Sequence, residues 1–542
     1  MKLRQIFIIG LLITGLGACK KQLDIKNPNQ PTTDAANSEQ GIVSLAQGSI
    51  YINGFTQVKY GETGYLAFAA TGIHDVMGDI VGGEAANAYL NQIGCPYQVI
   101  LDDGSVVLNP NSPKEQIELI RNINTNANQG ENVLYYEWAF MYNLIASANS
   151  ILDGAEKVEF TSDADTKKAV LQAWSYWWKG YAYSRIGSIY YAGIINDAPF
   201  KTNGKYVTKE QIIAESNANL DKAAGILGSI PSLDAYTTFL GKIIPSFFQV
   251  GKGGVPTPDM WKRNINTLKA RNILVNKKAS ELTAAEWGSI LSLVNSGITS
   301  SDNVFTGRSN ANGDFISGTT TISGKTQSTK AGGNTYKLSE RWVQEFKTGD
   351  KRLANNVALT TTWIGNSDRG NSFNTRYALV NGGNAMSGVV VYANTDPGAY
   401  ELYIAGTYEE NELMKAEAKI YTNDVEGGLA LIDAVRKNQG AGLPAVAGTS
   451  LTLAQAKEEL RRERRVTLAF RGLAFYDARR WGVIDALTDG GGRKNAIVVT
   501  NAGVVNTKAT IEYKFLDYWD VPDNELAYNP PAEGSADVKN PK

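Results

Sequence analysis

The chain contains a single histidine, His74, and it stands directly before Asp75 in the stretch GIHDVMGDIVGG. A His–Asp pair can serve a nucleophile as general base, so Ser-His-Asp and Cys-His schemes have one possible base here. A lone histidine beside an aspartate is more often a hydrogen-bonding residue of the core, and we expect that role for His74. With one His and two Cys, a zinc site built on several such ligands is not available.

Other catalytic motifs are absent as well. The sequence has no G-x-x-x-x-G-K-[ST] phosphate loop and no G-x-S-x-G nucleophile elbow. A glycosidase needs only two carboxylates, and nothing singles out one pair among 54 acidic residues. We therefore expect no enzyme activity and no cofactor or metal, with a surface glycoside hydrolase as the alternative.

Covalent chemistry of another kind is indicated at Cys19. Lys2 and Arg4 give a basic start, an apolar run ends at Leu16, and Gly17 and Ala18 lead into Cys19. This order is typical of a secretory signal peptide, and the run is too short to span a bilayer. Leu-Gly-Ala-Cys also matches a bacterial lipobox, in which the thiol is acylated and becomes the first mature residue. The alternative is an ordinary signal peptide with a chance cysteine.

The lipobox divides the chain into three predicted parts. We expect a signal peptide over residues 1–18, a lipidated tether over 19–40 and one domain over 41–542. No later segment offers about 18 uninterrupted apolar residues, so membrane contact is expected through the lipid anchor only.

Composition limits the partners and the sources of stability. The 53 basic and 54 acidic residues nearly balance, and together with export this argues against nucleic acid as a partner. Cys95 is alone once Cys19 is acylated, so we expect no disulfide within the chain. The 26 Tyr and 10 Trp offer flat amphipathic surfaces for ligands, or packing for a large helical core.

Helical periodicity dominates the elements that must position these residues. Residues 131–153 and 166–190 carry apolar side chains at spacings of three and four, and a short turn separates them. Two helices with a short link form an antiparallel hairpin. We expect further helices over 207–228, 259–278, 282–297, 401–422 and 424–438. Such pairs resemble tetratricopeptide units, although their irregular spacing indicates degenerate repeats.

Two long insertions interrupt the predicted helices. Residues 54–112 and 298–400 are rich in Gly, Asn, Ser and Thr and contain only short apolar stretches. Long irregular segments of this kind are usually functional when they are ordered. The predicted fold class is therefore mostly α, with helix pairs as the scaffold, long irregular loop insertions and a few short strands.

The most distinctive stretch is LRRERRVTLAFRGLAFYDARRWG, residues 460–482, which we expect to be helical. Glu458 and Glu459 precede Arg461 and Arg462 by three or four residues, a spacing that favours ion pairs on a helix. A nucleic-acid patch is the alternative for the arginines. Alternating acids and export favour a helix joined to its neighbours by arginine–carboxylate pairs.

These residues resemble the closing motif of the SusD/RagB family, which runs as E-R, then F-E-G-x-R, then D-L-x-R-W-G. The matching segments are residues 463–465, 468–472 and 476–482, and LMKAEA at 413–418 is similar to a further family helix. Arg471 stands where the family often has Glu. Members are surface lipoproteins of nutrient-uptake systems in Bacteroidetes.

The resemblance implies a function and partners. Family members bind oligosaccharides, or sometimes peptides, and lie as a lid on a SusC-like TonB-dependent outer-membrane transporter. They are not enzymes. The resemblance thus implies a cell-surface protein, anchored in the outer membrane, that captures oligosaccharides. A peptide- or other nutrient-binding lid and an adaptor that only docks the transporter remain open.

The ligand face of this family is formed by variable loops, so the binding residues are predicted from chemistry alone. Sugars need aromatic faces together with Asp, Asn or Arg for their hydroxyls. Trp363, in TTTWIGNSDRG, is the strongest candidate because its neighbours are small and polar; the alternative is a Trp that caps the local core. Trp138, Trp174, Trp177 and Trp178 lie on helical patterns and are expected to pack or to contact the transporter. The predicted ligand-binding residues are Asp75, Asp79, Tyr89 and Asn91 in the first insertion and Asn303, Phe305, Arg308, Trp363 and Tyr392 in the second.

Overall fold

The computed structural model describes residues 38–52, 54, 72–83, 89–199, 201, 203–308, 336–364, 374–394, 396 and 398–542. Cys19, the predicted signal peptide and nearly all of the predicted tether lie outside these residues, as does the side chain of Trp363. Among the helices of the described part, none is both long enough and apolar enough to cross a membrane.

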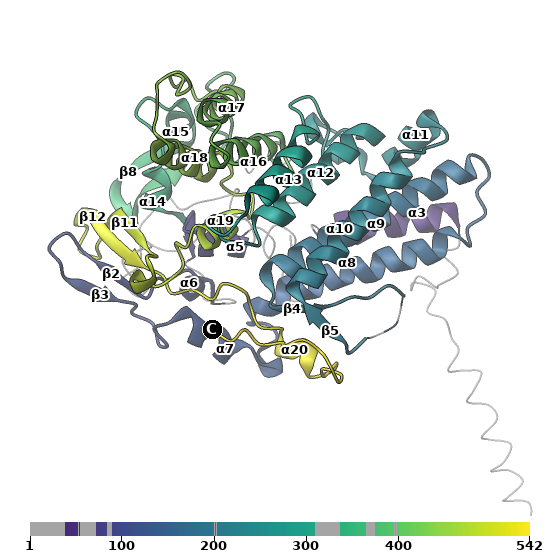
Figure 1. Cartoon of the computed structure of the whole chain (residues 1–542), viewed down its shortest axis with the longest axis horizontal. Coiled ribbons are helices and arrows are strands. Elements are labelled where there is room, and N and C mark those ends of the chain that lie inside the picture. The colour runs from purple at the N-terminus through teal and green to yellow at the C-terminus, as the bar shows by residue number, and fades with distance from the viewer. Residues whose placement is uncertain are drawn as a thin grey trace, which may run out of the picture.

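Paired helices form one side of the molecule, as the periodicity predicts (Figure 1). The pairs α8–α9 and α12–α13 pack as predicted, and α10 packs along α9 after the short β4–β5 ribbon. Threonines begin three of these helices: Thr208 and Thr283 form capping boxes with Gln211 and Glu286, and Thr257 caps a helix that starts with Pro258. The bounds are α3 (Glu39–Gln47), α7 (Gln116–Ile123), α8 (Val133–Ala155), α9 (Ala164–Ile189), β4 (Ala192–Ile194), β5 (Tyr206–Thr208), α10 (Lys209–Leu227), α11 (Leu233–Ile243), α12 (Pro258–Leu274) and α13 (Ala284–Asn295).

A cluster of aromatic side chains fills the space between α9 and α12. Trp174, Trp177 and Trp178 of α9 are at most 2% exposed, and the rings of Trp174 and Trp177 contact Trp261 of α12. Phe305 completes the cluster, with ring centroids 4.7 Å from Trp177 and 5.2 Å from Trp261. Packing is therefore the role of the helical tryptophans. Phe305 belongs to the same core and has no exposed face.

A second group of helices contains α16 (Tyr408–Tyr421), α17 (Val425–Asn438), α18 (Leu453–Thr467) and α19 (Ala474–Arg480). The predicted helix over 401–422 starts late, because Glu401–Tyr403 is strand β10 and Thr407 caps α16. The predicted helix over 460–482 is not continuous. α18 ends at Thr467, and Phe470 and Gly472, with φ of 62° and 67°, give the turn before α19 a left-handed backbone that a continuous helix could not contain.

The two insertions are more regular than expected and contact each other. Residues 54–112 include α5 (Ile73–Met77), β1 (Val81–Gly83), α6 (Leu90–Ile93), β2 (Gln98–Ile100) and β3 (Val106–Leu108). Residues 298–400 include β6 (Thr306–Arg308), β7 (Tyr336–Leu338), α14 (Glu340–Val343), α15 (Lys351–Asn356), β8 (Val357–Ile364) and β9 (Thr375–Leu379). Antiparallel pairing of Val81 with Leu338 joins β1 to β7 and so joins the insertions.

The C-terminal part completes a four-stranded sheet at the other side of the molecule (Figure 1). Its order is β11-β12-β2-β3, in which β11 (Arg493–Val499) and β12 (Val505–Glu512) take up the hairpin of the first insertion. The last short helix is α20 (Asp523–Leu526). The prediction of a mostly α scaffold with a few short strands is confirmed.

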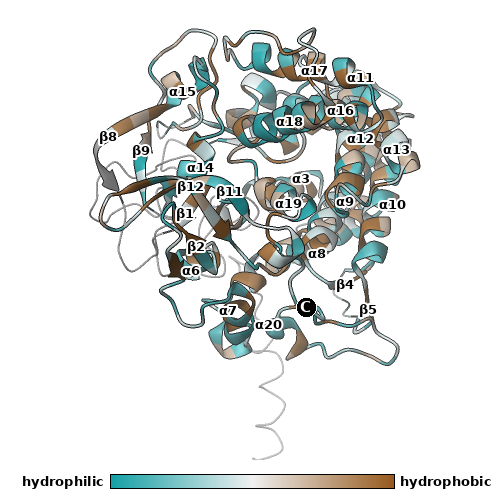
Figure 2. Ribbon diagram, turned by 60° about the vertical axis from the view of Figure 1, so that its left-hand side comes forward, coloured by the Kyte–Doolittle hydropathy of each residue, from teal (hydrophilic) through white to brown (hydrophobic). Residues whose placement is uncertain are grey.

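Helix α18 has an unusual position for its composition. Figure 2 shows it as a predominantly hydrophilic helix, yet Glu463, Arg464 and Arg465 are all buried. Buried charges must be paired, so this helix has to find carboxylates and cations on its neighbours. Some of its ion pairs lie in the core, and others lie at the cleft described next.

Candidate functional site

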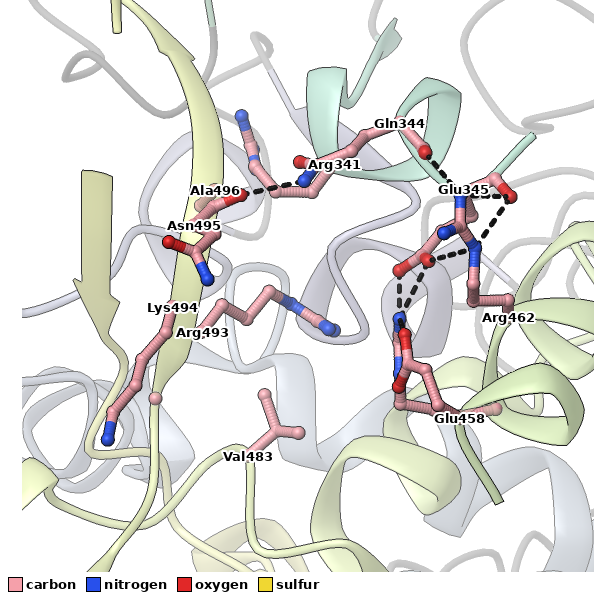
Figure 3. Close-up of a pocket in the computed structure, with 12 residues that line it drawn as sticks. Arg341, Gln344, Glu345, Glu458, Arg462, Val483, Arg493, Lys494, Asn495 and Ala496 are labelled. Carbon is pink, nitrogen blue, oxygen red and sulfur yellow. Dashed lines mark hydrogen bonds and ion pairs between the residues drawn. The ribbon is translucent and has the colours of Figure 1, made fainter. Parts of the chain in front are cut away.

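A cleft of about 370 Å³ opens between α14, α18 and β11 (Figure 3). It is lined mainly by polar side chains, with Val483 and Ala496 as the apolar exceptions. Five cationic side chains contribute to its wall, and only two carboxylates oppose them. The cations are Arg341, Arg461, Arg462, Arg493 and Lys494, and the carboxylates are Glu345 and Glu458.

On the α18 side of the cleft, a single arginine forms ion pairs with both carboxylates, Glu345 and Glu458. Arg461 donates to the two oxygens of Glu345 at 2.7 and 2.8 Å and to the two oxygens of Glu458 at 2.7 Å each. Burial raises the pKa of Glu345, but its hydrogen bonds with Arg461 outweigh burial and lower the pKa below its ordinary value. Both carboxylates are thus already paired with Arg461.

The neighbouring Arg462 is held by backbone rather than by an acid. Its Nε and Nη2 donate to the carbonyl oxygens of Gln344 and Glu345 at 3.1–3.3 Å, just after α14. The nearest carboxylate oxygen, on Glu345, is 3.8 Å away. Carbonyls at a helix C-terminus carry partial negative charge, so they orient the guanidinium without neutralising it.

On the β11 side, a bulge fixes the direction of the strand. The register of β11 against β12 shifts between Arg493 and Ala496, and Asn495 has a φ of 53°. The side chain of Gln344 secures this turn: its Nε2 donates to the Asn495 carbonyl at 2.7 Å, and its Oε1 accepts from the Ile497 amide at 3.0 Å. Bulges often re-aim side chains beside functional sites. Here the bulge leaves Arg493 extending into the cavity and Lys494 at its edge, pointing away (Figure 3).

Asp79, one of the residues predicted to bind ligand, lies behind the cleft. Its carboxylate accepts from Arg341 at 2.6 Å and from the Tyr513 hydroxyl at 2.7 Å, and it lies 3.5 Å from Arg493 Nε. Burial raises the pKa of Asp79, but the Arg341 guanidinium outweighs burial and lowers it well below the ordinary value. Asp79 therefore positions two arginines of the cleft.

A further arginine, Arg465, shows the excess of positive charge in this region. It is buried, and it donates to the carbonyl oxygens of Gly78 and Asp79 at 2.9 Å. Burial, together with repulsion from Arg493, lowers the pKa of Arg465 to about 10. The carboxylates of Glu345 and Asp79 raise the pKa of Arg465, but by less than burial and Arg493 lower it.

The other predicted residues of the first insertion lie around α5 and α6. Asp75 is fully buried in α5, and burial raises its pKa. Asn91 is also buried, whereas Tyr89 is partly exposed with a φ of 53° directly before α6. As placed, Asp75 and Asn91 offer no surface to a ligand.

The residues of the second insertion fall at three separate places. Asn303 is partly exposed beside Val255, and Arg308 is buried, donating to Gly398 at 2.8 Å and pairing with Glu401 at 2.9 Å. The hydroxyl of Tyr392 donates to the Val466 carbonyl at 3.1 Å inside the core. The backbone at Trp363 belongs to β8.

The structure thus does not bring the predicted residues into one site, because the aromatic and charged side chains of the insertions mostly turn inward. Sequence reasoning missed Arg341 and Gln344 at α14 and Arg493 on β11, which come from two segments about 150 residues apart. The one available signal was the excess of arginine over acid in RRERR at 461–465 and RK at 493–494.

His74 has the structural role expected for it. Its Nε2 lies 2.8 Å from a Glu137 oxygen, and Arg185 donates to the other oxygen of Glu137 at 2.6 Å. All three side chains are buried. Within the described ranges, no group of three or more His, Cys, Asp and Glu could hold a metal ion.

Comparisons with known proteins agree with this architecture. Residues 301–533 match the SusD family, whereas no curated protein sequence matches the chain. A SusD-like carbohydrate binding protein from Bacteroides fragilis is similar over 92% of this chain and 99% of its own, with a TM-score of 0.58 and 14% identity.

Two further solved structures share the fold. A SusD-like protein from Bacteroides fragilis covers 91% of this chain and 96% of its own, at 13% identity and a TM-score of 0.51. A protein whose crystal structure was determined with xylogluco-oligosaccharide is similar over 94% of this chain and 99% of its own, at 14% identity and a TM-score of 0.51. The part of the chain that matches the SusD family contains the closing motif on α18 and α19, and the paired-helix scaffold shares its fold with SusD-like proteins over nine-tenths of the chain.

Proposed function

We propose that this protein is a lipid-anchored protein of the outer membrane that captures oligosaccharides at the cell surface and passes them to a SusC-like TonB-dependent transporter. The observation that carries the proposal is the shared fold, which extends over nine-tenths of the chain to a SusD-like carbohydrate binding protein. A second protein with this fold was crystallised with xylogluco-oligosaccharide. The lipobox at Cys19 supports the location.

The chemistry of the cleft favours binding over catalysis. A glycoside hydrolase needs an acid whose pKa is raised so that it is protonated when the substrate binds. Glu345 has a lowered pKa, and Arg461 occupies its oxygens and those of Glu458. These two carboxylates are therefore unsuited to donate a proton to a leaving group.

We further propose that the ligand face extends from the cleft toward Trp363. Ile364 pairs with Thr375 at the end of the β8–β9 ribbon, and the adjoining Asn374 donates to the Val499 carbonyl at 3.0 Å. The strand end that carries Trp363 is thus next to the far end of β11. Lys494 and Val499 are about 16 Å apart along that strand, at roughly 3.3 Å per residue. Tyr89 and Asn303, which are partly exposed, remain proposed contacts elsewhere.

The test is a polysaccharide panel followed in two ways. The lipidated protein, purified in detergent, is run in affinity gels that contain each glycan, and released reducing ends are measured in parallel. We expect one glycan to retard the protein and no reducing ends to accumulate. Accumulating ends would show an enzyme, and an absence of retardation by every glycan would contradict oligosaccharide capture.

Trp363→Ala tests the proposed ligand face. We expect weaker retardation with an unchanged melting temperature, because stacking on a sugar is lost while the fold is kept. Tyr528→Ala is a matched control, since this aromatic side chain is 81% exposed near the C-terminus and distant in sequence from the face. A large loss of thermal stability with unchanged affinity would assign Trp363 to the core.

A further inference from the structure

We propose that the cleft between α14, α18 and β11 binds the anionic group of an acidic oligosaccharide, a carboxylate or a sulfate. The inference rests on the proposed function of oligosaccharide capture and names the class of ligand. It starts from the mismatch of charge in the cleft wall, where five cations face two carboxylates that Arg461 already occupies.

Three of the cations remain available to a ligand. Arg493 extends into the cavity, and its Nε donates to the Tyr513 hydroxyl at 3.1 Å, a neutral partner (Figure 3). The hydrogen bonds of Arg462 go to carbonyl oxygens, and its nearest carboxylate oxygen, on Glu345, is 3.8 Å away. Lys494 is exposed at the edge and forms no ion pair with any residue that the structure describes. The carboxylate nearest to Arg493, that of Asp79, is also at long distance, 3.5 Å, so an incoming anion competes with weak ion pairs only at the two arginines.

The guanidinium groups are also held in place before any ligand arrives. Gln344 secures the β11 bulge at Asn495 and Ile497, and the Asp79 carboxylate holds Arg341 behind Arg493. Because these side chains are already ordered, binding costs less conformational entropy than it would at flexible surface lysines. A guanidinium also presents parallel N–H donors that match the oxygens of a carboxylate or sulfate.

The size and polarity of the cleft select a sugar acid rather than a large polyanion. A volume of about 370 Å³ is near the lower end for small-molecule sites, enough for one or two sugar rings. Asn495 is exposed on the wall and can contact ring hydroxyls. Since Val483 and Ala496 are the only apolar residues of the wall, attraction between charges must supply most of the affinity.

The experiment is titration calorimetry of the lipidated protein in detergent with three tetrasaccharides. Tetragalacturonic acid carries carboxylates, a carrageenan tetrasaccharide carries sulfate without carboxylate, and cellotetraose is neutral. We expect at least one acidic tetrasaccharide to bind more tightly than cellotetraose. Its affinity should fall when NaCl rises from about 0.1 M to about 1 M, which shortens the Debye length from about 10 Å to about 3 Å. The two acidic ligands distinguish carboxylate from sulfate.

Variants locate the effect in the cleft. Arg493→Gln should weaken the binding of the acidic tetrasaccharide by about tenfold to 100-fold, which is the range for the loss of one charged hydrogen bond. If that variant does not fold, Lys494→Glu decides, because its side chain is exposed and the substitution places an acid at the edge. We expect Lys494→Glu to weaken binding by about threefold to tenfold. Lys508→Glu is the matched control, with the same change of charge on the exposed surface of the adjacent strand β12 and outside the cleft wall.

The outcomes separate this inference from the proposed function. Binding of cellotetraose as tight as that of the acids, unaffected by the variants, would overturn the anionic site and leave oligosaccharide capture intact. Equal losses in Lys494→Glu and Lys508→Glu would also overturn it, because the effect would then come from net charge. Binding of no glycan in this set or in the polysaccharide panel would overturn both.

Discussion

Arginines on the two sides of helix α18 have different roles. On one side they form buried ion pairs in the core, and on the other they line a cleft in which positive charge exceeds negative charge. Toward α15, α17 and α19, arginines such as Arg352, Arg436 and Arg480 meet carboxylates at short distance. Toward the cleft, arginines outnumber acids, and several are bound by backbone carbonyls or a hydroxyl instead. The difference follows from how far each side is removed from water.

The paired side contains two groups of buried ion pairs. Glu463 accepts from Arg352 at 2.6 Å and from Arg436 at 2.7 Å. The next residue of α18, Arg464, binds Asp477 at 3.0 Å. Arg480 donates to the same Asp477 at 2.7 Å and to Glu417 at 2.8 Å. All of these side chains are buried.

Such a network is stable only when it is complete. Removing one partner of a buried ion pair leaves an uncompensated charge, whereas a charge near water keeps part of its hydration. An arginine without a close carboxylate is therefore more costly in the core than at the wall of an open cleft, and when it is buried its donors must meet carbonyl oxygens, as those of Arg479 do at Ser188 and Val275. Unmatched charge beside a cavity is then a sign of a binding surface.

The largest effect is expected from Glu463→Gln. The substitution leaves Arg352 and Arg436 without their shared carboxylate, so the free energy of unfolding should fall by about 3–5 kcal/mol. Denaturant unfolding measures the change. Glycan affinity of the folded variant should stay within about twofold, because the network does not reach the cleft wall.

Glu458→Gln is the matched control on the same helix. Its side chain is 53% exposed and pairs with Arg461 on the cleft side, so we expect a loss of at most about 1 kcal/mol. Equal losses in the two variants would break the proposed contrast between the two sides of α18.

The pH dependence sharpens the same contrast. Burial raises the pKa of Glu463, but Arg352 and Arg436 outweigh burial and lower it from the ordinary 4.5 to about 2. A group with a lowered pKa stabilises the fold fully above its unfolded pKa and loses this contribution as pH falls toward the folded pKa. The difference in unfolding free energy between wild type and Glu463→Gln should thus be constant above pH 4.5 and shrink toward about pH 2. Denaturant midpoints at stepped pH measure it, and a difference that did not change would contradict this role.

An intermediate effect is expected from Gln344→Ala, which removes both hydrogen bonds that secure the β11 bulge. We expect a loss of about 1–3 kcal/mol in unfolding free energy, at roughly 0.5–1.5 kcal/mol for each of the two hydrogen bonds. Binding of the acidic tetrasaccharide should also weaken, because Arg493 is less well positioned. Gln129→Ala, at an exposed glutamine on another surface, should change neither quantity. Unchanged binding in Gln344→Ala would show that the bulge does not position Arg493.

The sequence predicts the helices of this fold well and its site poorly, for physical reasons. Residues 131–153 and 166–190 reveal their helices because the 3.6-residue period is a local property. The strand at Glu401–Tyr403 is missed because three residues cannot show a period of their own. The aromatic ring of Phe305 was expected to face a ligand, yet burial against tryptophans is the more favourable use of such a surface.

The cleft could not be predicted because its parts come together only through tertiary contacts. Glu345 and Arg461 are 116 residues apart, and Gln344 and Asn495 are 151 apart. The motif of α18 predicted correctly that arginines and acids pair. Which arginines remain unmatched depends on the segments that approach each side of the helix, and no local pattern encodes them.

The smallest effect is expected from Lys494→Ala, which tests the cleft side of the comparison at its edge. The side chain is exposed and points away from Arg493, so unfolding free energy should change by less than about 0.5 kcal/mol (Figure 3). A charge at the edge acts mainly on the encounter with the ligand, so association of the acidic tetrasaccharide should slow by less than about tenfold, with a shallower salt dependence. Stopped-flow kinetics measures both, and Lys508→Ala should show neither. A stability loss as large as that of Glu463→Gln would mean that Lys494 belongs to a paired network after all, and the contrast between the two sides of α18 would then not extend to β11.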